Sequence, residues 1–361
     1  MHKYRISHLI IGGYISLFSI WIIGIFFCRN YVPIEYCDEL ERNIYKPGIS
    51  ILSTKEGYAL TKCGKSGIIA PLDKPDIISD AVLLMGNSFA EGLHVPDYYK
   101  MHQIANKELL SNKYESLQIY NVAMSSQLFC DTLWQIPKYL KYYRCIKGIV
   151  VIVMSHDLLP TSKSSQYGSS IVNDNGNYAI LPPPPNLITK FGIIKYKFHL
   201  NAFLALAKGL QNSFFDWKSR VFSQPLKQNI NNVELAKKNF ENQDIDEYLD
   251  FQLSKLRSTT NLPILILCCI DKPIRTSQGI KNINVDSILT QKVKYYSKKN
   301  NIDFYTMRED FNQLNDNNLI VCGFSNTLPG DGHFSIYAHQ AIGEKISNWC
   351  LNTIIIKEAK K

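Results

Sequence analysis

The chain has 361 residues and a mild basic excess, with 40 Lys and Arg against 31 Asp and Glu and a formal net charge of +9. Apolar residues make up 45% of the sequence and charged residues 20%, proportions that exclude a largely disordered chain. The basic residues are scattered in short runs, so their pattern gives no support to nucleic-acid binding. The sequence also lacks the regular repeat that a solenoid or propeller requires.

Residues 8–28 form an apolar run without Lys, Arg, Asp or Glu. As a helix, this run spans roughly 30 Å, the thickness of a bilayer core. Lys3 and Arg5 precede it, so the positive-inside rule keeps the short N-terminus cytoplasmic and exports the rest. The alternatives are a cleaved signal peptide, which the bulky residues before Cys28 disfavour, and a buried helix of a soluble protein. We therefore expect a single-pass membrane protein whose main domain lies on the outer, extracytoplasmic side.

The spacing of the nine cysteines matches no Cys-x-x-Cys or Cys/His metal-binding motif. Cys28 lies at the membrane edge, and the other eight are an even number that an exported domain could oxidise. However, Cys268 and Cys269 are adjacent in an apolar run, where small buried hydrophobic residues are the simpler interpretation.

Regular patterning begins near residue 80, after an irregular segment at 29–79 that we interpret as a stalk with small β elements. The run at 148–154 is apolar throughout, which is typical of a strand covered on both faces in a parallel sheet. Strands are expected at 81–85, 117–124, 148–154, 263–270 and 302–305, and helices near 98–110, 131–143, 247–258, 285–299 and 336–352.

The alternation breaks at 158–244, a segment rich in Ser and Asn that we interpret as an insertion. Within it, residues 198–210 predict a packing helix, with a second membrane contact as the alternative. The predicted fold class is α/β: a three-layer α/β/α sandwich with a mainly parallel, flavodoxin-like sheet over residues 80–350. A basic tail at 351–361 follows it, and residues 1–28 hold the cytoplasmic N-terminus and the transmembrane helix.

Gly86-Asn87-Ser88-Phe89 follows the first strong strand directly. Sites in open α/β sheets form at the carboxyl ends of strands, and Gly86 allows a tight turn there. Ser88 then begins the next segment, where backbone N–H groups point at a developing negative charge. Taken alone, the motif is better interpreted as an ordinary serine in a turn.

A second candidate motif, Gly330-Asp331-Gly332-His333, precedes the last helix. A serine nucleophile needs a histidine as general base, and an acid holds that histidine. Asp331 and His333 lie two residues apart on a Gly-flanked loop, so both can reach one cleft. Alone they would fit a helix cap and a surface histidine, but together with Ser88 they predict serine-dependent catalysis.

These motifs resemble the SGNH (GDSL-like) hydrolase superfamily. Residues 86–89 are similar to its first block, usually Gly-Asp-Ser-Phe/Leu, and residues 91–96 to the continuation common in bacterial envelope members. Asp331-x-His333 matches the closing block, and the resemblance covers about residues 80–160 and 245–350.

The resemblance implies a role for each matching residue. Ser88 is the nucleophile, His333 the base and Asp331 its orienting partner. The backbone N–H of Ser88 also contributes to the oxyanion hole. His94 and His339 fall outside these roles. His94 lies six residues after Ser88 and could line the cleft, but a packing role is the favoured interpretation, as it is for His339.

Two departures concern the rest of the oxyanion hole. The second block, residues 121–126, places Ser126 where the family usually has Gly, and its backbone N–H would be the donor. The third block ends Ser155-His156-Asp157, so His156 replaces the usual Asn. An imidazole N–H can stabilise an oxyanion if it is correctly aimed. The alternative is a structural His156 and a weakened hole.

The expected chemistry is acyl transfer through an acyl-serine intermediate, without a metal or an organic cofactor. Exported relatives often modify envelope glycans, so the resemblance favours O-acetyl groups of a carbohydrate, with an SGNH-type esterase favoured over an O-acyltransferase. The alternatives are a lipase- or thioesterase-like acyl hydrolase, or a catalytically weak scaffold that binds glycan or a membrane acyltransferase partner.

Overall fold

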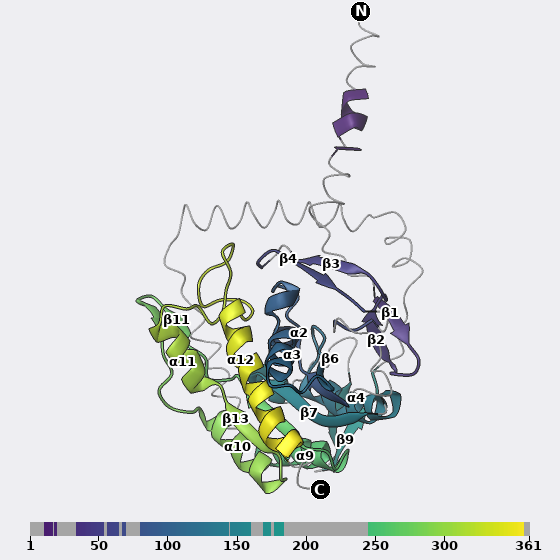
Figure 1. The fold of residues 1–361 in the computed structure, drawn as a ribbon, viewed down its shortest axis with the longest axis vertical. Helices are drawn as coiled ribbons and strands as arrows, with labels where there is room; N and C mark the ends of the chain where they lie inside the picture. Colours follow the sequence, from purple (N-terminus) through teal and green to yellow (C-terminus); the bar gives the residue numbers. More distant parts are fainter. Residues whose placement is uncertain are drawn as a thin grey trace, which may run out of the picture.

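The computed structural model (Figure 1) describes residues 11–16, 18–19, 34–53, 56–64, 67–69, 80–143, 145–159, 169–174, 177–183 and 245–356. Among these residues, no helix is both long and apolar enough to cross a membrane. Most of the predicted span at 8–28 lies outside them, so that span stays a prediction. The expected helix at 198–210, like most of the insertion, also lies outside the described residues, as do residues 357–361 of the tail.

The centre of the molecule is a five-stranded sheet in which every neighbouring pair is parallel. Its strands are β5 (Asp80–Met85), β6 (Leu117–Asn121), β7 (Ile146–Val153), β10 (Ile264–Cys268) and β13 (Asp303–Thr306). Their order across the sheet is β13-β10-β7-β5-β6. This is the flavodoxin-like order, in which the winding direction reverses between β5 and β7. The predicted parallel sheet is confirmed, and in sheets of this topology ligands bind outside the carboxyl ends of the two strands at the reversal.

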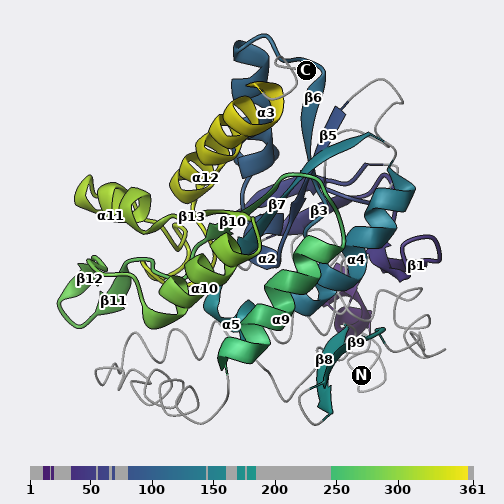
Figure 2. The same ribbon diagram turned by 90° about the horizontal axis from the view of Figure 1, so that it is seen from below.

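Helices cover both faces of the sheet (Figure 2). On one face lie α3 (Met101–Ser111), α11 (Arg308–Asp316) and α12 (Ile336–Trp349), and on the other α4 (Phe129–Tyr142), α9 (Ile245–Ser258) and α10 (Ile288–Lys299). Residues of β5 alternate between the two faces: Val82 and Leu84 pack toward α3, whereas Leu83 and Met85 pack toward α4. The layers are therefore those of the predicted sandwich.

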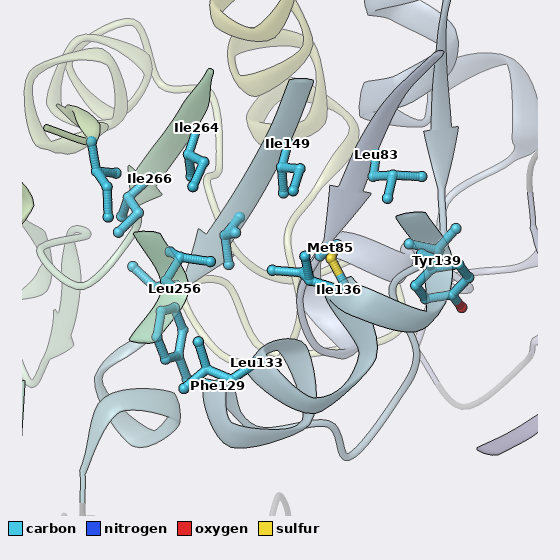
Figure 3. Packing of buried hydrophobic residues seen from close by; sticks show 14 of the residues in the cluster. Leu83, Met85, Phe129, Leu133, Ile136, Tyr139, Ile149, Leu256, Ile264 and Ile266 are labelled. Atoms are coloured by element: carbon cyan, nitrogen blue, oxygen red, sulfur yellow. The ribbon is translucent and has the colours of Figure 1, made fainter. Parts of the chain in front are cut away.

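Burial on both faces explains the continuous apolar runs in the sequence. Figure 3 shows Leu83, Met85 and Ile149 of the sheet packed against Leu133 and Ile136 of α4. All five side chains are at most 2% exposed. Each such aliphatic side chain contributes about 1.5–3 kcal/mol on burial, so the central strands are a rigid base for the loops that follow them.

Within the described residues, four small two-stranded sheets surround the sandwich. They are β1 (Ile34–Cys37) with β2 (Arg42–Tyr45), β3 (Ser50–Ser53) with β4 (Ala59–Lys62), β8 (Ser170–Asp174) with β9 (Asn177–Leu181), and β11 (Ile274–Thr276) with β12 (Gly279–Lys281). The first two agree with the small β elements expected in 29–79. The other two, and α11, are short elements that the sequence analysis did not predict. The last predicted helix continues past α12 as a π-helical turn at Cys350–Ile355.

Buried polar contacts hold the N-terminal hairpins β1–β2 and β3–β4 against the sandwich, the second through Thr61 of β4, whose hydroxyl accepts from Lys100 Nζ over 2.5 Å. Arg42 is 6% exposed, and its guanidinium donates to the hydroxyl of Tyr139 on α4 over 2.6 Å. The Tyr45 hydroxyl donates to the carboxylate of the fully buried Glu91. Buried polar groups that lose their partners are costly, so these contacts fix the hairpins in one position.

Among the described residues, the buried cysteines are free thiols. Cys268 and Cys269 are both fully buried, on opposite faces of the sheet. Burial raises the pKa of Cys268 to about 12, so this thiol behaves as a small apolar side chain, as the sequence pattern indicates.

Candidate active site

Ser88 lies directly beyond the carboxyl end of β5, as the first residue of the short helix α2 (Ser88–Glu91). The turn into this helix requires Gly86, whose φ is +148°. A Cβ at this position would lie 2.9 Å from Ala90 Cβ and 3.0 Å from the Ile152 carbonyl oxygen. The missing side chain therefore lets the loop pass close to β7 and places Ser88 at the crevice.

Asn87 fixes the orientation of this turn. Its side-chain oxygen accepts from the Phe89 N–H over 2.9 Å and so caps α2. Its amide nitrogen donates to both carboxylate oxygens of Asp157, at 2.8 and 3.0 Å. Asp157 is buried in α5 (Ser155–Leu158), directly after β7, and burial raises its pKa. The Asn87 side chain thereby joins the two loops on either side of the crevice.

The imidazole of His333 bridges Ser88 and an acid. His333 Nε2 lies 2.8 Å from Ser88 Oγ, and His333 Nδ1 lies 2.7 Å from Glu56 Oε2. The backbone N–H of His333 donates to the same Glu56 oxygen over 2.9 Å. These hydrogen bonds from His333 lower the pKa of Glu56 to about 2, so the carboxylate is ionised at neutral pH. Nucleophile, base and acid are thus aligned as in a serine-hydrolase triad.

The structure corrects the prediction that Asp331 orients His333. The Asp331 side chain is 58% exposed, and its carboxylate accepts from Arg275 over 3.3 Å. Glu56 fills the space beside the loop instead: a Cβ on Gly332 would lie 2.6 Å from Glu56 Oε2. Sequence proximity to His333 therefore did not decide which acid reaches the imidazole.

Glu56 comes from the connection between β3 and β4, in the segment that the sequence shows as irregular. Its neighbour Gly57 donates its N–H to the Asn326 side-chain oxygen over 2.7 Å, which ties the connection to the His333 loop. The sequence signal is a single acidic residue before a glycine, without periodicity. Such a signal is too common to single out Glu56.

His94 also reaches the site, although it was expected to be a packing residue. Its ring centroid lies 4.3 Å from that of His333, and its Nδ1 lies 2.8 Å from Ser53 Oγ. Phe89 approaches His333 as well, with ring centroids 4.8 Å apart. His339, by contrast, is fully buried packing, as expected: its Nδ1 accepts from the Met101 N–H over 3.2 Å, and burial lowers its pKa to about 3.

The residues predicted for the oxyanion hole lie in the loops after three adjacent strands. Ser126, after β6, has a φ of +66°, in the left-handed region that glycine adopts without strain. Nearby, the Met124 N–H donates to the Gly86 carbonyl over 3.2 Å, so the Ser126 loop contacts the Ser88 turn. His156, after β7, is 54% exposed. Its Nε2 faces Asn87 Nδ2 at 3.0 Å and Asp157 Oδ1 at 3.3 Å, which leaves Nδ1 as the nitrogen for a ligand.

No protein-family model matches the chain, and no curated protein matches it. Solved structures that it resembles include the esterase EstA from Pseudoalteromonas sp., at 9% identity and a TM-score of 0.36 over 78% of this chain and 100% of that one. A member of the lipolytic protein G-D-S-L family from Veillonella parvula matches at 9% identity and a TM-score of 0.38, covering 77% and 99%. The acetyl xylan esterase AlAXEase matches at 10% identity and a TM-score of 0.35, covering 74% and 98%.

With TM-scores below 0.4 for all three, the likeness assigns neither a substrate nor a residue role to this chain. Any assignment of function depends on the hydrogen-bonded line of Ser88, His333 and Glu56.

Proposed function

We propose that the protein is a serine-dependent hydrolase of acyl esters. The observation that carries the proposal is the continuous line of hydrogen bonds from Ser88 Oγ through His333 to Glu56, at 2.8 and 2.7 Å. A half-buried serine rarely has an imidazole and an ionised carboxylate in this order unless its oxygen is used as a nucleophile.

In the proposed reaction, Ser88 Oγ attacks the ester carbonyl carbon while His333 Nε2 takes the hydroxyl proton. Glu56 accepts the Nδ1–H hydrogen bond, so its negative charge stabilises the imidazolium that forms. The tetrahedral intermediate collapses to an acyl-serine as His333 returns the proton to the departing alcohol. Water then attacks the acyl-serine, again with His333 as base, and releases the acid.

The developing oxyanion needs donors at the carboxyl ends of the strands. The backbone N–H groups of Ser88 and Ser126 are the proposed main donors, together with His156 Nδ1. Because Nε2 of His156 already faces Asn87 and Asp157, Nδ1 is the nitrogen that substrate can meet. Hydrogen-bond donors placed before the reaction are the largest single contribution in most acyl-transfer sites.

The proposed substrate class is an O-acetyl ester of an envelope carbohydrate, with the domain held on the outer side of a membrane by residues 8–28. This part rests on the sequence: the anchor-like apolar run and the resemblance of residues 86–96 to envelope members of the superfamily. A sugar hydroxyl in place of water would make the same acyl-serine an acyltransferase intermediate. A membrane acyltransferase would then be a natural source of acyl groups.

Intact-mass analysis of the full-length protein with an activated acetyl ester tests the mechanism. We expect a transient adduct of about 42 Da, the acetyl group replacing the hydroxyl hydrogen, located on Ser88 by peptide mapping. Ser88→Ala is the matched control, because this half-buried hydroxyl contributes little to packing. An unchanged adduct and unchanged esterase turnover in folded Ser88→Ala protein would overturn the proposal and favour the scaffold alternative.

A further inference from the structure

Three potential metal ligands converge beside the proposed nucleophile. Glu56, His94 and His333 each offer one ligand atom, and these atoms all lie within 4.8 Å of one another. The residues come from three separate segments: the β3–β4 connection, the loop after α2 and the loop before α12. None of them belongs to a metal-binding spacing in the sequence, so the juxtaposition is a product of the fold.

The donor set is chemically selective. Two imidazoles and one carboxylate are a ligand set that suits Zn²⁺, in particular at sites that keep a fourth position open. Ca²⁺ and Mg²⁺ prefer all-oxygen sites. With metal–ligand distances of about 2.0–2.2 Å, two ligands of a tetrahedral ion lie roughly 3.4 Å apart. Side-chain rotations that close the widest gap by about 1–1.5 Å would therefore complete the shell.

Other contacts already hold these ligands in place. Ser53 Oγ lies 2.8 Å from His94 Nδ1, a contact that orients the imidazole ring beside His333. The Glu56 carboxylate is held by the backbone N–H of His333 over 2.9 Å. Such hydrogen bonds to a ligand's remaining atoms fix its orientation and are typical of metal sites in proteins.

We propose that Glu56, His94 and His333 bind Zn²⁺ and that the bound ion inhibits the esterase. Binding through His333 uses either Nδ1, which faces Glu56, or Nε2, which faces Ser88. Either choice takes the lone pair of one imidazole nitrogen, with any displaced proton passing to the buffer, and breaks one of the two hydrogen bonds of the proposed triad. Metal binding and proton transfer through His333 therefore exclude each other.

The inhibition rests on the proposed function, but the binding does not, so the two are measured separately. The binding assay uses full-length Ser88→Ala protein, stripped of metal, with Zn²⁺ in competition with a chromophoric chelator. We expect one Zn²⁺ per chain and an X-ray absorption spectrum with two imidazole ligands. Adding His94→Phe, which keeps a ring against His333, or Glu56→Gln should weaken binding by at least about 10-fold. Asp331→Asn is the matched control and should leave binding unchanged, because its carboxylate faces Arg275.

The inhibition assay uses wild-type protein with a chromogenic acetyl ester. Zn²⁺ should abolish turnover, a chelator should restore it, and Mg²⁺ should have no effect. Relative to its own metal-free rate, His94→Phe should need at least roughly 10-fold more Zn²⁺ for half inhibition. Both proteins carry the same cysteines, so zinc binding to thiols cancels in this comparison.

The failures are distinguishable. No binding at about 1 mM Zn²⁺, or equal affinity in the His94→Phe and Asp331→Asn variants, overturns the metal site. Zinc-dependent activation of Ser88→Ala protein overturns both the inhibition and the serine mechanism. Esterase activity that is absent with or without metal, while the three-ligand binding persists, contradicts the proposed function alone.

Discussion

The carboxyl edge of the sheet and the β3–β4 hairpin each supply one hydrogen-bond partner of His333, and the two partners are held in place differently. On the Ser88 side, β5 is almost completely buried, and the turn after it is held by Asn87 and by close packing against β7. On the Glu56 side, β4 alternates between buried and exposed residues, and the carboxylate reaches His333 from outside the α/β sandwich. Ser88 is therefore positioned by the core, whereas the position of Glu56 depends on how the hairpin docks.

This difference makes the acid the more informative position for mutation. Replacing Glu56 with Gln should lower kcat by about 10³-fold or more, because an amide cannot carry the charge that stabilises the imidazolium. Asp331→Asn should change kcat less than twofold, since its carboxylate pairs with Arg275 at the surface. Steady-state kinetics on both folded variants test the comparison. A larger loss in Asp331→Asn than in Glu56→Gln would reverse the assignment.

The second expected effect lies on the sheet side of the site. If His156 donates to the oxyanion, His156→Ala should lower kcat by roughly 10²–10³-fold, or about 3–4 kcal/mol, with little change in KM. His156→Asn, which restores the family's usual donor, should retain more activity. Melting temperatures of both variants provide the control, because a structural His156 would lower stability rather than kcat. Near-normal kcat in folded His156→Ala protein would rule out the oxyanion role.

The contact between Glu56 of the β3–β4 connection and the His333 loop can be tested by a substitution at Gly332. Its φ is +85°, and an added Cβ would lie 2.6 Å from Glu56 Oε2. Gly332→Ala should therefore displace the Glu56 carboxylate and lower kcat by roughly 10-fold, and the strained backbone should cost about 1–3 kcal/mol in stability. Gly279→Ala is a useful control, since Gly279 has a φ of +114° but nothing within 4 Å of its added Cβ. Equal kcat in the two variants would mean that Gly332 does not position Glu56.

The sandwich and the nucleophile–base pair could be predicted from sequence because each leaves a local signal. Buried strands are continuous apolar runs, and Ser88 follows the run that becomes β5. The Ser88–His333 contact joins residues 245 positions apart, and the strand–helix alternation brings them to one edge of the sheet. Glu56 leaves no such signal: its contact with His333 spans 277 positions and arises from hairpin docking. Asp331 lies only two residues from His333 in the sequence, but its carboxylate pairs with Arg275 and Glu56 packs against Gly332 instead.

The last expected effect is on stability and separates the two regions by pH, through His339 on α12. Its pKa is lowered to about 3 by burial, whereas the unfolded chain has the ordinary value near 6.5. As the pH falls from 6.5 toward 3, His339 binds a proton in the unfolded state but not in the folded state. The free energy of unfolding therefore decreases by about 1.4 kcal/mol per pH unit. Above pH 6.5, His339 is neutral in both states, and its contribution to stability does not depend on pH. Glu56, with a pKa of about 2, contributes a similar loss only below about pH 4.5.

Loss of stability between pH 6.5 and 4.5 should therefore come from His339 in the sandwich, together with the neighbouring buried His102, and not from the hairpin junction. Thermal unfolding as a function of pH measures this loss. His339→Gln, which keeps an acceptor for the Met101 N–H, should flatten the curve in this range, whereas Glu56→Gln should leave its slope unchanged. If Glu56→Gln, and not His339→Gln, flattened the dependence of stability on pH in this range, the acid-sensitive contact would lie at the hairpin.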